Sequence, residues 1–203
     1  MTVSKQIHAH FDEHARVVTA AFDSLGGGIE EYVTRVAQTI QAGGCLFFCG
    51  NGGSAADAQH LAAEYVVRFT RERRAVAAVA LTTDTSVLTA AGNDLGFDGV
   101  FARQIEALGS PGDLLVLHST SGMSPNLLAA ADAAQACGVK TVALLARGGG
   151  ALADRVDLAL VVPTDSTARA QELHLLIGHA VCDVVEASLP HERPLRQGQG
   201  QPT

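Results

Sequence analysis

The sequence predicts an α/β protein of the doubly wound type: a three-layer αβα sandwich with a five-stranded parallel sheet, preceded by N-terminal helices. Two observations predict this fold. Short, continuous apolar runs alternate with longer stretches of helical periodicity, as expected for parallel strands that helices cover on both faces. The composition, 47% hydrophobic and 17% charged, is that of a globular chain, and 203 residues are enough for one such domain.

The expected elements follow one another along the chain. Two N-terminal helices, at 5–23 and 29–41, are separated by Gly26, Gly27 and Gly28, because glycine disfavours a helix interior. Strands are expected at 45–49, 76–81, 114–118, 140–146 and 157–162. Helices are expected at 54–69, 84–92, 98–108, 125–137, 150–154 and 166–188. We therefore expect one domain over 1–189 with a helical N-terminal extension, and a flexible polar tail over 190–203.

The bulk properties exclude some classes of function. A formal net charge of −7 gives no overall basic field, so we expect no nucleic-acid partner. The N-terminus has no apolar signal-peptide core, and no stretch is long and apolar enough to span a membrane. We therefore expect a cytoplasmic protein without a membrane partner. Cys45 and Cys49 would lie roughly 13 Å apart on one strand, too far apart to pair.

Two loops between a strand and a helix have the composition of ligand sites. The first, Cys49 to Ser54, has three glycines that let the backbone approach a ligand, and Ser54 could cap the following helix. In open α/β sheets, ligands collect at such carboxyl ends of strands. A tight glycine turn with no ligand is the alternative, and the sequence leaves it open.

The second loop has four hydroxyl groups in six residues, followed by Pro125 at the start of a helix. The hydroxyls belong to Ser119, Thr120, Ser121 and Ser124. Hydroxyls and backbone amides at a helix N-terminus can bind phosphate without a lysine. One serine would suffice to cap the helix, so this density favours phosphate binding over capping alone.

Acidic and imidazole side chains gather on two of the expected helices. His60 and Glu64 share a helix face, and Asp57 lies one turn before His60. The last helix carries Gln171 and His179 among its polar residues. A zinc site with mixed nitrogen and oxygen ligands would suit this set. A solvated face or a surface ion pair is the plainer interpretation of His60 and Glu64 alone.

Several motifs together resemble the phosphoheptose isomerases of the sugar isomerase (SIS) family. They are residues 48–54 with Asp57, His60 and Glu64; residues 91–97; residues 101–104; the loop 119–124; and residues 171–174 through His179. The resemblance covers about residues 40 to 188, in order and at matching separations. Met123, where the family often has a polar residue, and His118 depart from its pattern.

The resemblance implies a fold, a reaction and a site. It implies a flavodoxin-like SIS domain that isomerises D-sedoheptulose 7-phosphate to D-glycero-D-manno-heptose 7-phosphate through an enediol. It implies one zinc ion per subunit, held by His60, Glu64, Gln171 and His179, with Glu64 as catalytic base and His179 as catalytic acid. The implied substrate-binding residues are Asn51, Gly52, Gly53, Asp57, His60, Glu64, Asn93, Asp94, Ser119, Thr120, Ser121, Ser124 and Gln171. Metal ligation competes with proton transfer at Glu64 and His179, so the two roles could alternate during turnover.

Two other functions are compatible with the fold, and the assembly is a separate expectation. A non-catalytic SIS-fold protein that associates with a replication initiator has a similar first motif but lacks the acid and base, which are present here. An arabinose 5-phosphate isomerase is usually longer. The family resemblance implies a homo-oligomer, a tetramer. Gln171 and His179 stand about 12 Å apart along one helix axis, so we expect neighbouring subunits to complete the site.

Overall fold

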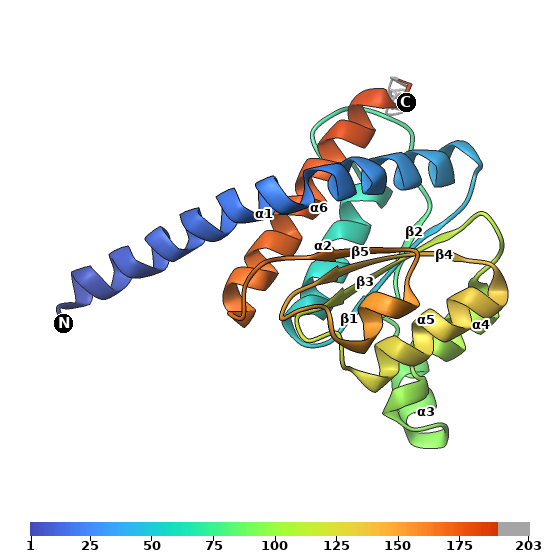
Figure 1. Ribbon diagram of the computed structural model, residues 1–203. Coiled ribbons are helices and arrows are strands. Elements are labelled where there is room, and N and C mark those ends of the chain that lie inside the picture. Colours follow the sequence, from blue (N-terminus) through green and yellow to red (C-terminus); the bar gives the residue numbers. More distant parts are fainter. Residues whose placement is uncertain (191–203) are drawn as a thin grey trace, which may run out of the picture.

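The computed structural model describes residues 1–190. Within that range five parallel strands form one sheet between two layers of helices, which confirms the predicted fold class (Figure 1). The strands are β1 (Leu46–Gly50), β2 (Ala78–Ala80), β3 (Leu114–Ser119), β4 (Lys140–Leu145) and β5 (Leu158–Val161). The predicted tail from 191 onward lies outside the described residues.

The strand order is β2-β1-β3-β4-β5, the flavodoxin-like arrangement. Every residue of β1 and of β3 is buried, because helices cover both faces of these central strands. This explains the continuous apolar runs in the sequence. β2 is shorter than the predicted strand 76–81, since only three of its residues pair with β1.

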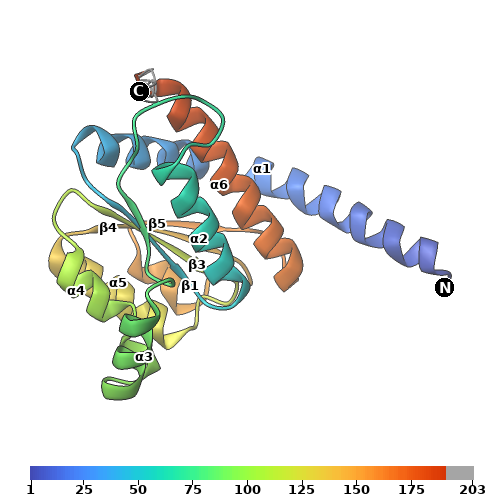
Figure 2. The same cartoon turned by 180° about the vertical axis from the view of Figure 1, so that it is seen from behind.

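The helices divide into two layers with separate apolar cores. One layer consists of α1 (Val3–Gln41), α2 (Gly53–Val66) and α6 (Thr167–Ser188), and the other of α3 (Thr85–Asp94), α4 (Ala102–Leu108) and α5 (Pro125–Cys137). Figure 2 shows the same layers from behind, with α3 on the side of the sheet away from α1 and α6. Phe48 packs into the first core, and its strand neighbours Phe47 and Cys49 pack into the second.

The prediction of two N-terminal helices was wrong, because α1 is one helix of 39 residues. Gly26 and Gly27 lie within it, and each costs about 0.8–1 kcal/mol relative to alanine. Packing outweighs this cost: Tyr32 and Val36 are buried in the first core. At Gly28 a Cβ atom would lie 2.6 Å from Leu160 Cδ2, so glycine allows the helix to approach β5 closely.

Three smaller differences concern short elements. The predicted helix 98–108 is a 3₁₀ turn, η1 (Phe97–Gly99), followed by α4. The predicted helix 150–154 is also a 3₁₀ segment, η2 (Gly150–Arg155). All four cysteines are free thiols, as expected. No helix within residues 1–190 has the length and apolar character needed to cross a bilayer.

Candidate active site

The two predicted ligand loops lie side by side at the carboxyl ends of β1 and β3. These strands are direct neighbours, and Gly50 at the end of β1 pairs with His118 near the end of β3. The chain leaves β1 toward β2 on one side, whereas β3 leads toward β4 on the other. Ligands of doubly wound sheets bind at such a switch point.

Glycines shape the first loop. Gly52, with φ 58° and ψ −120°, is the N-cap of α2, in a conformation that favours glycine. The expectation that Ser54 caps this helix was therefore wrong: Ser54 lies inside α2, and no side chain caps the helix. A Cβ at Gly53 would come within 2.5 Å of Gln171 Nε2, so the Gln171 side chain lies against this loop.

A buried asparagine that the sequence analysis missed joins the two loops. Asn126 in the first turn of α5 is 2% exposed, and its side chain pairs with that of Asn51. The Asn51 amide is thus engaged within the protein. No local pattern in the sequence points to this pair, because the two residues are 75 positions apart.

The hydroxyls of the second loop have different roles. Ser119 Oγ accepts the N–H of Gly122 at 3.0 Å, and Ser121 Oγ accepts the N–H of Met123 at 3.2 Å. Ser124 is the N-cap residue of α5, yet its side chain makes no capping bond. A hydroxyl that accepts one hydrogen bond still has its O–H to donate. The loop is therefore ordered by its own amides while its O–H groups can donate to an anion.

A second turn supports the hydroxyl loop from behind. Leu152 N donates to Gly122 O at 3.0 Å. A Cβ on Gly122 would collide with Gly149 O, and a Cβ on Gly150 would collide with Ser121 O. All three glycines have positive φ. Neither turn has room for a side chain at these positions.

His60, Glu64 and His179 form one cluster between α2 and α6. The two histidine Nε2 atoms are 2.7 Å apart, and His60 Nε2 is 3.3 Å from Glu64 Oε1. One ligand atom from each residue lies within 4.8 Å of the other two. Glu64 and His179 thus meet within a single chain, so this pair does not need a second subunit.

The cluster fits a zinc ion. Two imidazole nitrogens and one carboxylate oxygen are a common catalytic zinc set, which leaves a position open for substrate. His60 is 45% exposed at its side chain, so the cluster is accessible from solvent.

The environment shifts two pKa values in the site. Burial lowers the pKa of His179, as does the nearby His60, while Glu64 partly opposes the shift. Burial raises the pKa of Asp57, against an opposing effect of His60. Asp57 Oδ2 is buried and has no hydrogen-bond partner among the described residues.

Two predicted substrate residues lie elsewhere. Asn93 and Asp94 are exposed at the end of α3, where Asn93 Nδ2 donates to Asp94 Oδ1 at 2.7 Å. Helix α3 packs into the core layer opposite α2 and α6 (Figure 2). Within residues 1–190, the contacts described for these two side chains do not link them to either loop.

The comparisons with known proteins identify the family. A family model described as the SIS domain matches residues 9–146. The phosphoheptose isomerase of Roseiflexus sp. (strain RS-1) is 56% identical over 190 residues, which is 94% of each chain. The chain belongs to the SIS-domain family of phosphoheptose isomerases. The phosphoheptose isomerase of Akkermansia muciniphila is 50% identical and covers 83% of this chain and 89% of its own.

Solved structures of family members have the same fold. The phosphoheptose isomerase of Neisseria gonorrhoeae superposes with a TM-score of 0.87 at 44% identity. That of Francisella tularensis gives a TM-score of 0.89 at 35% identity. Each alignment covers 92% of this chain and 100% of the other.

Proposed function

We propose that this family member converts D-sedoheptulose 7-phosphate to D-glycero-D-manno-heptose 7-phosphate through an enediol, a step of heptose biosynthesis. The chain is an isomerase, as are the relatives that match it over nearly its whole length. One observation carries the proposal: Glu64 and His179 converge between α2 and α6, and α2 begins at the first of two loops suited to a phosphorylated sugar.

The aldose–ketose exchange moves one proton between C1 and C2 and another between the two oxygens. In our assignment the Glu64 carboxylate takes the carbon-bound proton, and His179 transfers a proton at the neighbouring oxygen. Glu64 is 20% exposed at its side chain, so water surrounds it only partly. Asp57, with its unpartnered buried oxygen, orients His60 or the substrate from one turn earlier on α2.

A zinc ion is part of the proposal. His60, Glu64 and His179 of one chain would hold it. Gln171 of that chain lies against Gly53, so as a fourth ligand Gln171 would come from a neighbouring subunit. When bound, the ion would polarise the substrate carbonyl and stabilise negative charge on its oxygen. The imidazole of His179 must be neutral to ligate, which its lowered pKa favours.

The hydroxyl loop would bind the phosphate. The O–H groups of Ser119, Thr120, Ser121 and Ser124 can donate to phosphate oxygens at the N-terminus of α5. The backbone of Gly52 and Gly53 would approach the sugar across the switch point, with Asn51 fixing the loop. The phosphate on the seventh carbon would lie at the hydroxyl loop, and C1 and C2 would extend toward the Glu64 cluster.

We further propose a homotetramer. Residues 1–12 are exposed, and this end of α1 projects beyond the rest of the domain (Figures 1 and 2). Val3, Ile7 and Phe11 recur every four residues and form an apolar stripe, exposed by 71%, 53% and 72%. Copies of this chain would bury the stripe and could bring Asn93 and Asp94 toward a neighbouring site. Action in the cytoplasm stays a prediction.

The alternative is a non-catalytic SIS-fold binding protein. Such a protein would not require an acid and a base beside the ligand loops. The convergence of Glu64 with His179 favours the enzyme.

The test is direct. Purified protein is incubated with sedoheptulose 7-phosphate, and aldoheptose 7-phosphate is followed by NMR. Glu64→Gln should lower turnover by roughly 10²-fold or more while substrate still binds. Substrate binding without turnover in the wild-type protein, with or without Zn²⁺, would support the binding-protein alternative.

A further inference from the structure

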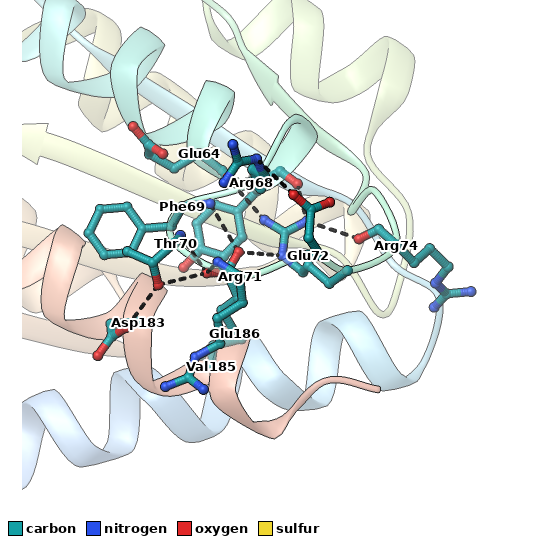
Figure 3. Close-up of polar contacts among 12 residues, drawn as sticks. Glu64, Arg68, Phe69, Thr70, Arg71, Glu72, Arg74, Asp183, Val185 and Glu186 are labelled. Atoms are coloured by element: carbon teal, nitrogen blue, oxygen red, sulfur yellow. Dashed lines mark hydrogen bonds and ion pairs between the residues drawn. The ribbon is translucent and has the colours of Figure 1, made fainter. Parts of the chain in front are cut away.

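A buried carboxylate on α6 anchors the segment that connects α2 to β2. Glu186 accepts the N–H groups of three successive residues, Phe69, Thr70 and Arg71, at 2.7–2.9 Å. Arg73 Nε donates to the same carboxylate at 2.9 Å. Figure 3 shows Phe69, Thr70 and Arg71 gathered around Glu186. Burial alone would raise the Glu186 pKa, but these donors outweigh it and lower the pKa, so the group is charged.

Arg73 ties this carboxylate to the end of α2. Its side chain and that of Glu186 are only 3% and 2% exposed. Besides Glu186, the guanidinium donates to the carbonyl oxygens of Glu64 at 2.6 Å and of Tyr65 at 2.9 Å. The last turn of α2, which carries the proposed catalytic base, is thus bonded to the same buried pair.

Phe69, in the anchored segment, contacts His179 of the proposed site on α6. Its ring stacks on the His179 imidazole, with centroids 5.2 Å apart and planes 24° apart. His179, Asp183 and Glu186 follow one another on α6 at spacings of four and three, so they share one face. Thr70 Oγ1 donates to Asp183 at 3.3 Å, between the stacked ring and the anchor.

We propose that Glu186 and Arg73 are positioning residues for the His60–Glu64–His179 site. Their ion pair fixes the path of the segment Val67–Arg74, and Phe69 in that segment restricts rotation of the His179 ring. The inference rests on the proposed function for its effect on turnover. The effect on the His179 ring is independent of it.

Holding the segment in place would not by itself require a buried ion pair. Burying two charges has a large desolvation cost, and apolar residues of similar size often stabilise a fold equally well. Apolar residues cannot bind three consecutive backbone N–H groups and the carbonyls of Glu64, Tyr65 and Arg74, which together set the conformation of the segment. The aromatic ring placed by that conformation contacts a proposed catalytic residue.

The experiment compares Glu186→Gln with a matched control, Asp113→Asn. Asp113, just before β3, is another buried carboxylate that accepts backbone N–H groups, but its donors are Cys45 and Ser110 and not the segment that follows α2. Melting temperature, kcat and KM are measured for each variant. The His179 Cε1–H NMR signal, assigned with His179→Gln, is recorded without substrate.

Both variants should lose a similar amount of melting temperature, but we expect kcat to fall about tenfold further in Glu186→Gln than in Asp113→Asn. A tenfold difference in kcat corresponds to about 1.4 kcal/mol of activation free energy. The His179 signal should shift in Glu186→Gln and stay in place in Asp113→Asn. Phe69→Leu, which leaves the ion pair intact, should shift the same signal and lower kcat with little change in KM. Phe69→Tyr keeps an aromatic ring at this position, so its His179 signal and its kcat should stay close to those of the wild type.

Two results would overturn the proposal. One is an equal loss of kcat in Glu186→Gln and Asp113→Asn. The other is an unchanged His179 signal in Phe69→Leu, which remains readable if Glu186→Gln does not fold. A wild-type protein that is inactive on sedoheptulose 7-phosphate would refute the proposed function alone, because the His179 signal needs no substrate.

Discussion

The side chains of Asn51 and Asn126 form a reciprocal amide pair, in which each Nδ2 donates to the other Oδ1 at 2.9 Å. The pair joins the loop after β1 to the helix after the hydroxyl loop. Asn126→Asp keeps the shape but replaces a donor with an acceptor, which leaves Asn51 Oδ1 without its donor.

We expect Asn126→Asp to lower the free energy of unfolding by about 1–3 kcal/mol and to raise KM, because the two loops lose their link. Urea denaturation and steady-state kinetics would check this. Gln135→Glu, at an exposed glutamine near the end of α5, is the control for added charge. An unchanged urea midpoint in Asn126→Asp would show that the pair contributes nothing.

Two glycines inside α1 should be replaceable with a gain in stability. A Cβ at Gly26 or Gly27 meets no atom within 4 Å, and neither glycine has positive φ. Each substitution to alanine should raise the free energy of unfolding by about 0.5–1 kcal/mol. Gly28→Ala is the control: its Cβ meets Leu160, so it should not stabilise the protein. Equal effects at all three positions in thermal denaturation would contradict this explanation.

The buried His118 should make the fold sensitive to acid. Burial, together with the nearby His174, lowers the His118 pKa to about 3, well below about 6.5 for an unfolded histidine. Between these values the unfolded state binds more protons, so stability falls as the pH drops.

His118→Leu should therefore lose roughly 2–3 kcal/mol less than wild type when the pH falls from 7 to 4.5. His174 faces His118, and burial lowers its pKa to about 4. His174 should therefore still cause part of the loss of stability at low pH in His118→Leu. Denaturation curves at several pH values, with the exposed His8→Leu as control, would measure the difference. Parallel pH curves for His118→Leu and wild type would rule out this role.

The proximity of Glu64 and His179 in one chain predicts the outcome of a subunit-mixing experiment. Inactive Glu64→Gln and His179→Asn chains, dissociated and reassembled together, should regain no activity, because each site takes both residues from the same chain. Recovered activity would place the two residues of a working site on different chains, against the geometry described here. Mixed assembly itself is checked by differently tagged chains.

Loss of two loop hydroxyls should weaken anion binding more than it disturbs the fold. Ser119→Ala with Ser121→Ala removes two candidate phosphate donors, each worth about 1.5–3 kcal/mol in a charge-assisted bond. Phosphate should then raise the melting temperature of the double variant less than that of wild type. Equal protection by phosphate would locate the anion elsewhere.

Local patterns predicted the strands well, because each central strand is covered on both faces and must be apolar throughout. The same reasoning failed at Gly26–Gly28, where local propensity favours a break but contacts with β5 and α6 extend the helix. His60, Glu64 and the hydroxyl loop were accessible from spacing and composition. Asn126 and Phe69 were not, since their partners lie 75 and 110 positions away and only the folded chain brings them together.

The glycine contact between the hydroxyl loop and the turn at residues 148–150 constrains any attempt to engineer a new substrate range. Randomising the loop from Ser119 to Ser124 would fail at Gly122 unless Gly149 were also moved, since the two backbones touch. Positions 122, 149 and 150 should therefore stay glycine in a library. Met123 is 57% exposed and has room for other side chains, although its sulfur accepts the N–H of Ala151 at 3.3 Å. Substitutions in the hydroxyl loop and in the turn about 27 residues later would therefore have to be chosen together.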